Sequence, residues 1–352
     1  MCIPTNELAD LVRQTKLGAA PQEARCLQIV IDTIEKGNVT ARLDSRQSCF
    51  LADLTDKFKH FLKPEMTTLL RSNDFYGVDL PVSNAFARRG RGRGQVIVFD
   101  GLLHLIRYYA DLITVLSLLQ LRRPEAIMTV DDVVQPEALS FSSAGFAIMA
   151  DSIETGRTPA AIGDILGLKA RKNVKMGYLG AVLFILMHEV GHIHLGHLDA
   201  VLGYSERPIR SLAIDEPIGD AQSNEFEADA FAYTSLRDEV RQDIISSVLF
   251  FLGPFAFLEA FAFPDGDSHP LAVNRAAHLG RLMDAGTDAA SQVARIIESQ
   301  VAGIQQLAAR RREAAGDLRH RIHERMPLDQ AYRIVAEIKA RVASDVGLLE
   351  VQ

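Results

Sequence analysis

The chain has 352 residues, of which 48% are hydrophobic, and this is enough for one large domain or two modest ones. Its net charge of -7 gives no overall basic field, so we expect no binding of nucleic acid. The three cysteines, Cys2, Cys26 and Cys49, form no C-x-x-C pair or disulfide framework, and the first residues show no signal-peptide pattern. We therefore expect a cytoplasmic protein whose cysteines are buried or inert.

The first 75 residues are predicted to form a helical segment. Asn6 can cap a helix that begins at Glu7. Residues 21–37 begin with proline and end with glycine, which is the pattern of a second helix. Amphipathic spacing continues over residues 51–63, and no catalytic or metal-binding motif occurs in this segment.

Residues 75–99 have a different character and are predicted to form two short strands joined by a loop. The loop, residues 88–94, has four arginines without aromatic residues between them, which favours a solvated turn over an RNA contact. A helix is predicted from Gly101 towards Leu121. Residues 122–177 mix short periodic pieces with turns, and we interpret them as a helical structural insertion, with a lid over a cleft as the alternative.

The stretch Tyr178–His197 contains the strongest motif of the chain. It reads YLGAVLFILMHEVGHIHLGH, an apolar run that ends in H-E-x-x-H at residues 188–192. Because successive residues of an α-helix are about 100° apart, His188 and His192 project from one face, where they can share one Zn²⁺. Glu189 lies beside them as a candidate base that accepts a proton from water. A buried helix would hold both imidazoles rigidly, but the motif alone also occurs by chance.

Two further histidines, His194 and His197, follow this motif. If the helix continues, His197 lies on the face opposite to His188. The three-histidine zinc signature would need glycine and histidine at the positions that Leu195 and Leu198 occupy. We therefore interpret His194 and His197 as residues at the helix end and not as zinc ligands.

A second helix is predicted to begin at Asn224, with acidic residues on one face. Glu225 and Asp229 are four residues apart, so both project from the same side. Glu225 is the candidate third ligand of a site with two histidines, one glutamate and a fourth position for water. Asp229 could accept a hydrogen bond from a zinc-binding histidine. The alternative is an ordinary acidic first turn, and Glu227 is expected to point elsewhere.

Residues 244–263 form a long apolar stretch. Its uninterrupted apolar part, Val248–Leu258, is too short to cross a bilayer, which takes about 20 residues. We expect no membrane span but two buried helical segments broken at Gly253-Pro254, with membrane association as the alternative.

The rest of the chain adds one candidate residue. His269 precedes Pro270 at the expected start of a helix, where it could donate to an oxyanion or be only a turn residue. Residues 286–352 are predicted to form helices, the last of them from about Leu328, that serve as a packing or an oligomer surface.

The order of these motifs resembles the HtpX-like and CAAX-prenyl-protease family of zinc metallopeptidases. The resemblance covers about residues 76–282, but clear membrane spans are missing and the spacing before His188 is long for the family. The matching motifs are Asn84-Ala85-Phe86-Ala87, the apolar run VIVF, Gly101-Leu102-Leu103, H-E-x-x-H at 188–192, E-x-x-A-D at 225–229 and H-P-x₄-R at 269–275.

The resemblance implies zinc ligands at His188, His192 and Glu225, with Glu189 as the general base. It further implies that Asn84 and His269 contact the substrate or stabilise the intermediate, and that Asp229 and Arg275 brace the site. The expected activity is hydrolysis of peptide bonds in a protein or peptide substrate by a metal-activated water. The list of residues implied by the resemblance is therefore the same as the list derived above, with Asn84 and Arg275 added.

Two other functions stay open. The phage-exclusion and ImmA-like regulatory zinc proteases also combine H-E-x-x-H with a downstream glutamate. A zinc-binding pseudoenzyme that acts as a binding module is the second alternative, but a structural site has no need of Glu189.

We therefore predict a mainly α protein with a small β-sheet (α+β), built around a zincin-like metallopeptidase core. The predicted parts are an N-terminal helical segment (1–75), the zinc metallopeptidase core (76–285, with the insertion at about 122–177) and C-terminal helices (286–352).

Overall fold

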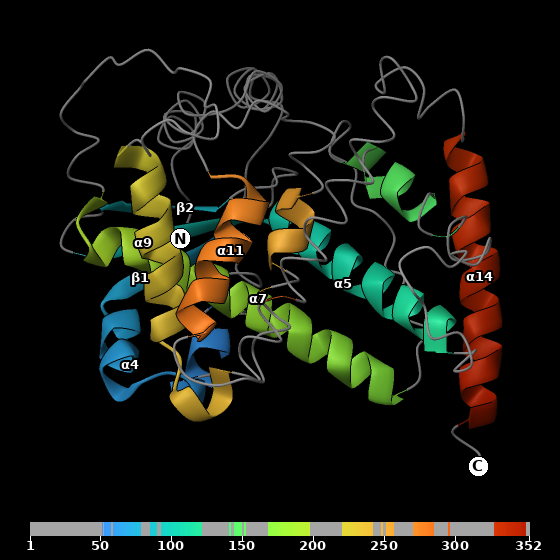
Figure 1. Ribbon diagram of the computed structural model, residues 1–352, viewed down its shortest axis with the longest axis horizontal. Helices are drawn as coiled ribbons and strands as arrows, with labels where there is room; N and C mark the ends of the chain where they lie inside the picture. The colour runs from blue at the N-terminus through green and yellow to red at the C-terminus, as the bar shows by residue number, and fades with distance from the viewer. Residues whose placement is uncertain are drawn as a thin grey trace.

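The computed structural model describes residues 51–78, 85–89, 93–121, 141–152, 168–197, 220–241, 248–256, 270–284, 295 and 327–349, apart from single positions and short gaps inside these ranges. This part of the chain is mainly helical and has one small sheet, as expected for an α+β protein (Figure 1). Its elements are η1 (Lys59–Phe61), α4 (Pro64–Arg71), β1 (Asn73–Val78), β2 (Ala85–Arg89), β3 (Gly94–Phe99), α5 (Asp100–Leu121), α7 (Leu168–His194), α9 (Asp220–Thr234), α11 (Ala272–Asp284) and α14 (Leu328–Leu349).

The sheet has three strands in the order β1-β3-β2. β1 pairs with β3 in parallel, and β2 pairs with β3 in antiparallel orientation. Four successive residues of β3, Val96 to Phe99, are buried, so both faces of the central strand are covered. The sequence predicts two strands here, and this number is wrong. Residues 79–84 separate β1 from β2, and they include Pro81, which cannot donate a ladder hydrogen bond.

The arginine-rich loop is described only at its two ends. Arg88 and Arg89 belong to β2, and Arg93 precedes β3. The Arg93 guanidinium lies 2.9 Å from an Asp74 carboxylate oxygen and donates to the backbone carbonyl of Arg71 at 2.6 Å. Arg93 is thus bonded within the protein, where it ties the start of β3 to the end of α4.

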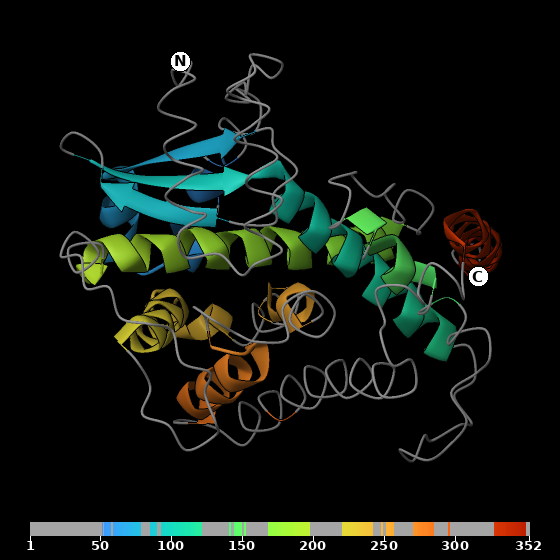
Figure 2. The same cartoon turned by 90° about the horizontal axis from the view of Figure 1, so that it is seen from above.

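Helix α7 occupies the middle of three layers. Figure 2 shows the sheet on one side of α7, and α9 and α11 on the other side. Helix α5 follows β3 directly and runs alongside α7. Residues 180–191 of α7 are all buried, as expected for a helix that is apolar on every side. The H-E-x-x-H motif therefore begins inside the main hydrophobic core, which includes side chains from the sheet, α5, α9 and α11.

A second apolar cluster lies at the far end of α5. It joins α5 to residues 141–149 and to α14, which begins at Leu328 as predicted. Three buried residues of α14, Ala331, Val335 and Ile338, follow the helical repeat and face this cluster. The cluster anchors the last helix without contributing to the site described below.

Several element boundaries differ from the sequence prediction. Helix α7 begins at Leu168, so residues 168–177 of the expected insertion belong to it, and α9 begins at Asp220 instead of Asn224. Residues 251–256 form a continuous helical segment, so the break predicted at Gly253-Pro254 is wrong, although the expected burial is confirmed. The fixed backbone angle of proline is compatible with helical geometry.

Some predictions lie outside the described residues. They include residues 1–50 with Cys2, Cys26 and Cys49, most of the 122–167 segment and the helix expected before residue 327. Within the described part, one stretch, Lys175–His194, is long and apolar enough to cross a membrane, with a mean hydropathy of 1.4. Of the most apolar 18-residue window of this stretch, 72% is buried inside the protein. Helices in the core of soluble proteins have the same length and composition, so the stretch is weak evidence for a membrane span.

Candidate metal centre

The two histidines of the H-E-x-x-H motif lie on one face of α7, one helical turn apart, as predicted. The Nε2 atoms of His188 and His192 are 3.1 Å apart. His188 is buried and the side chain of His192 is 13% exposed, so both imidazoles are held by the surrounding core. The apolar run before the motif thus fixes both rings at the point where α7 leaves the core.

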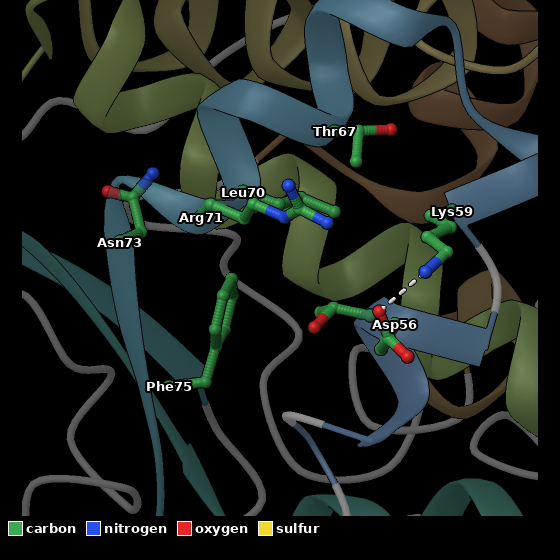
Figure 3. Close-up of a pocket in the computed structure, with 8 residues that line it drawn as sticks. Asp56, Lys59, Thr67, Leu70, Arg71, Asn73 and Phe75 are labelled. Atoms are coloured by element: carbon green, nitrogen blue, oxygen red, sulfur yellow. Dashed lines mark hydrogen bonds and ion pairs between the residues drawn. The ribbon is translucent and has the colours of Figure 1, made fainter.

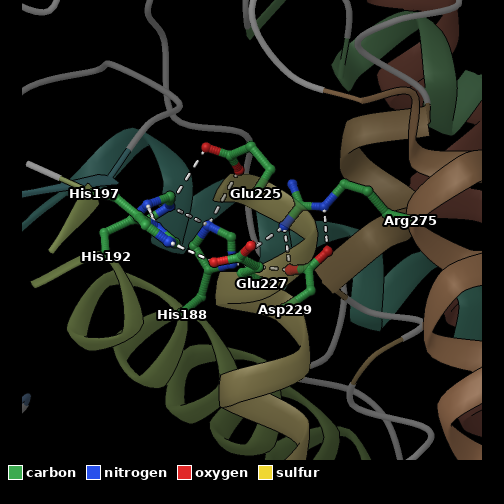
Figure 4. Close-up of polar contacts among 7 residues, drawn as sticks. All are labelled: His188, His192, His197, Glu225, Glu227, Asp229 and Arg275. Carbon is green, nitrogen blue, oxygen red and sulfur yellow. Dashed lines mark hydrogen bonds and ion pairs between the residues drawn. The ribbon is translucent and has the colours of Figure 1, made fainter. Parts of the chain in front are cut away.

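The third group of the centre comes from α9. One Glu225 carboxylate oxygen lies 3.3 Å from His188 Nε2, and the other lies 3.4 Å from His192 Nε2 (Figure 4). Ligand atoms about 2.0–2.2 Å from a tetrahedral Zn²⁺ are about 3.3 Å apart, so these separations fit a shared zinc ion. His188, His192 and Glu225 together could hold a metal ion.

Gly191, inside the motif, lets α9 approach α7 closely. A Cβ atom at this position would lie 3.1 Å from Phe231 Cδ1 and 3.3 Å from the backbone Cα of Ala228. Both are tighter than ordinary van der Waals contacts, and Ala228 belongs to the same helix as Glu225. The small residue at Gly191 is therefore part of what brings the carboxylate to the two histidines.

Asp229, one turn after Glu225 on α9, supports His188 from behind. Its Oδ1 lies 2.9 Å from His188 Nδ1, so His188 donates a hydrogen bond from Nδ1, and in the neutral ring the lone pair is then on Nε2, the atom that faces His192 and Glu225. Arg275 on α11 donates to both oxygens of Asp229, at 2.7 and 2.6 Å. The Arg275 guanidinium also lies over the Phe251 ring, 4.9 Å from its centroid. Asp229 thus contacts His188 on one side and Arg275 on the other.

The charges around His188 shift the pKa values of His188 and Asp229. Burial by itself lowers the pKa of His188, but hydrogen bonds to Asp229 and Glu225 outweigh burial and raise that pKa to about 10. Burial would raise the pKa of Asp229, but the charge and hydrogen bonds of Arg275 hold it below its usual range. His188 and Asp229 therefore form a charged pair in the metal-free chain.

Glu189 is the acidic residue of the motif and is buried, with 8% of its surface exposed. It follows His188 in the chain and sits on the helix that bears both histidines. A carboxylate that follows a candidate metal-binding histidine in the chain is the residue type that can accept a proton from water.

His197 differs from its prediction. Helix α7 ends at His194, and Gly196 has a φ of 80°, a left-handed conformation that breaks the regular helical path of the chain. The Nδ1 atom of His197 thus lies 3.0 Å from His192 Nδ1, and its Nε2 lies 3.1 Å from a Glu227 carboxylate oxygen. The prediction that His197 faces away is wrong because the helix does not continue. Glu227, which was expected to point elsewhere, also contacts this group.

A comparison with protein families supports a peptidase. A model of the Peptidase U49 family matches residues 159–295, a segment that includes α7, α9 and Arg275. The matched segment is less than half of the chain, and the match supports a peptidase without pointing to the HtpX-like or CAAX-protease type specifically. No curated protein and no solved structure matches the chain significantly.

Three other predicted residues lie outside this group. Asn84 and His269 lie outside the described residues, so their roles stay predictions. His194 is the last residue of α7, as expected, and its ring lies 5.3 Å from that of Phe231. Sequence reasoning missed the contribution of His197 and Glu227; the glycine before His197 is the signal that could have revealed it.

A separate pocket lies between α4, β1 and the helical residues before η1 (Figure 3). None of the predicted site residues is among those that line it, and Lys59 at its rim is bonded to Asp56 at 2.8 Å. The pocket is lined by Thr55, Asp56, Lys59, Thr67, Leu70, Arg71, Asn73 and Phe75. We assign no function to it.

Proposed function

We propose that the chain is a zinc-dependent peptidase whose metal ligands are His188, His192 and Glu225. The observation that supports this most directly is the convergence of the three side chains from two helices, at 3.1 to 3.4 Å from one another. The donor set of two imidazoles and one carboxylate is one of those that catalytic zinc uses, with one position open. The Peptidase U49 match over the same helices favours peptide hydrolysis over other zinc chemistry.

The chain's own residues divide the work of hydrolysis. The chemistry that Zn²⁺ supplies when bound is Lewis-acid activation of water and of a carbonyl oxygen. Glu189 accepts a proton as the water oxygen attacks the carbonyl carbon, and it passes this proton to the leaving amine as the C–N bond breaks. Asp229 keeps His188 in the tautomer that leaves Nε2 free, and Arg275 fixes Asp229.

The substrate-binding side of the proposal rests on the resemblance noted above. Asn84 and His269 are proposed to contact the substrate, with His269 as a donor to the developing oxyanion. The substrate is a protein or peptide, and the proposed location is the cytoplasm. A regulatory protease of the phage-exclusion or ImmA type is the alternative kind of zinc peptidase. It would use the same three ligands and the same base.

The decisive experiment compares wild type with Glu189→Gln on both metal content and hydrolysis. We expect both proteins to retain one Zn²⁺ per chain, measured by elemental analysis after gel filtration. Loss of the carboxylate should lower the hydrolysis rate about 10²- to 10⁴-fold, followed by intact mass of candidate substrates after digestion. Equal rates for the two proteins would remove Glu189 as the base.

A matched pair of variants tests the ligand set. Glu225→Ala should lose zinc, and Glu239→Ala, which removes an exposed charge beyond the end of α9, should keep it. Retention of zinc by Glu225→Ala would contradict the proposed site. A wild-type protein that binds zinc but hydrolyses no peptide would instead support the pseudoenzyme.

A further inference from the structure

His192 and His188 are supported in different ways. The Nδ1 atom of His188 is bonded directly to a carboxylate, that of Asp229. The Nδ1 atom of His192 faces the Nδ1 atom of His197 at 3.0 Å, and the far side of His197 is bonded to Glu227 at 3.1 Å (Figure 4). His192 thus reaches a carboxylate through an intervening imidazole.

The hydrogen-bond partners determine which ring nitrogen donates and which accepts in His197 and His192. A carboxylate accepts hydrogen bonds, so the Nε2 atom of His197 donates to Glu227. A neutral imidazole then has an acceptor at the other nitrogen, so His197 Nδ1 accepts from His192 Nδ1. His192 is left with its lone pair on Nε2, the atom that lies 3.4 Å from Glu225. This is the tautomer that a zinc ligand needs.

We propose that His197 and Glu227 are positioning residues that hold His192 in its metal-binding tautomer and orientation. This inference rests on the proposed metal centre and adds to it two residues that neither the motif nor its spacing indicated. Residues that bond to the far nitrogen of a metal-binding histidine typically change metal affinity about 10- to 100-fold.

The contacts of His197 and Glu227 distinguish a positioning role from direct metal binding and from a role in the stability of the core. Both ring nitrogens of His197 are engaged, one by His192 and one by Glu227, and His197 is not among the three groups that converge on the candidate metal position. The side chain of Glu227 is 58% exposed, so its removal leaves no buried charge. An effect of Glu227 on metal binding would therefore be transmitted through His197 and not through the core.

The chain geometry that makes this contact possible is the turn after α7. Gly196 adopts a φ of 80°, which a residue with a side chain adopts at a cost of about 1–2 kcal/mol. Without this turn His197 would continue along the helix and face away from His192.

The test measures the Zn²⁺ affinity of the full-length protein by competition with a chromophoric chelator. We expect His197→Ala to weaken binding about 10- to 100-fold and Glu227→Ala to weaken it less. Glu227→Gln should lie between Glu227→Ala and wild type, because its amide oxygen still accepts from His197. The double variant should bind as His197→Ala does, since Glu227 acts only through His197.

Two control variants accompany the series. His194→Ala removes an exposed histidine from the same segment, and Glu239→Ala removes one exposed negative charge, and both should bind as wild type does. Thermal midpoints of the metal-free proteins show whether each variant is folded. Because Glu227 is largely exposed, its variants should fold even if His197→Ala does not.

The outcomes distinguish this inference from the proposed function. A wild-type protein without Zn²⁺ affinity contradicts the metal centre and, with it, this inference. Tight binding by wild type together with equally tight binding by the His197 and Glu227 variants overturns the inference alone. Complete loss of binding in His197→Ala, equal to that in His192→Ala, also overturns it, because His197 would then be a ligand.

Discussion

Arg275 holds Asp229 by two hydrogen bonds, from Nη2 to Oδ1 at 2.6 Å and from Nε to Oδ2 at 2.7 Å. The two residues are 46 positions apart, on α11 and α9, and both are buried. The pair thus connects the last helix of the centre to the helix that provides Glu225. It also fixes the carboxylate that orients His188.

The first prediction concerns the stability of this pair. Asp229→Ala removes the carboxylate that pairs with Arg275, a residue only 3% exposed, and the loss of one member of a buried ion pair typically destabilises by about 3–5 kcal/mol. Urea unfolding of the metal-free protein measures the change. Asp238→Ala breaks the exposed pair with Arg241 and serves as the control, with an expected change close to zero. Equal midpoints for both variants would contradict the assigned role.

The second prediction concerns the approach of α9 to α7. Alanine at position 191 would stabilise α7 by up to about 1 kcal/mol through helix propensity. Its methyl group would also lie 3.3 Å from the backbone of Ala228 and push α9 away. Gly191→Ala should therefore weaken Zn²⁺ binding several-fold with little loss of metal-free stability. Unchanged affinity would show that α9 can move without displacing Glu225.

The sequence predicts the centre well where the chain follows regular helical geometry. His188 and His192 share a face of α7, and Glu225 and Asp229 share a face of α9, because both pairs have a spacing of four residues within unbroken helices. The positions of the two helices relative to each other depend on packing around Gly191, which spacing alone does not give. Only the structure shows that Glu225 reaches both histidines.

Prediction from the sequence failed where the backbone leaves regular geometry. The expected position of His197 assumed a continuing helix, but the chain turns at Gly196. The number of strands was wrong for a similar reason, because the apolar pattern over residues 75–99 does not show that residues 79–84 separate β1 from β2. At Gly196 a turn residue, and not the hydrophobic period, decides the structure.

The third prediction concerns pH. The pKa of His188 in the metal-free chain is raised to about 10, so this imidazole holds a proton at neutral pH. A metal ion binds the neutral ring and must displace this proton. Zn²⁺ affinity should therefore rise with pH, about tenfold per unit while His188 stays protonated, and the rise should end as pH passes the raised pKa. Chelator competition between pH 6.5 and 8.5 measures the slope.

The control for this pH dependence is Asp229→Asn. It removes the negative charge that raises the pKa of His188, while burial, which lowers that pKa, remains. The affinity of this variant should depend less steeply on pH than that of wild type. An equal slope in the two proteins would show that Asp229 does not govern the protonation of His188.

The last prediction links the metal centre to stability. A ligand that binds only the folded state stabilises it by about 2.7 kcal/mol at a free concentration 100 times its Kd. Zn²⁺ should therefore raise the thermal midpoint of wild type, and a chelator should reverse the rise. Glu225→Ala should lose this rise, because the carboxylate that contacts both histidines at 3.3 and 3.4 Å is gone. Glu239→Ala, which keeps all three ligands, should retain it in full. If Glu225→Ala and wild type are stabilised equally by Zn²⁺, the ion binds elsewhere, and His188, His192 and Glu225 do not form the metal centre.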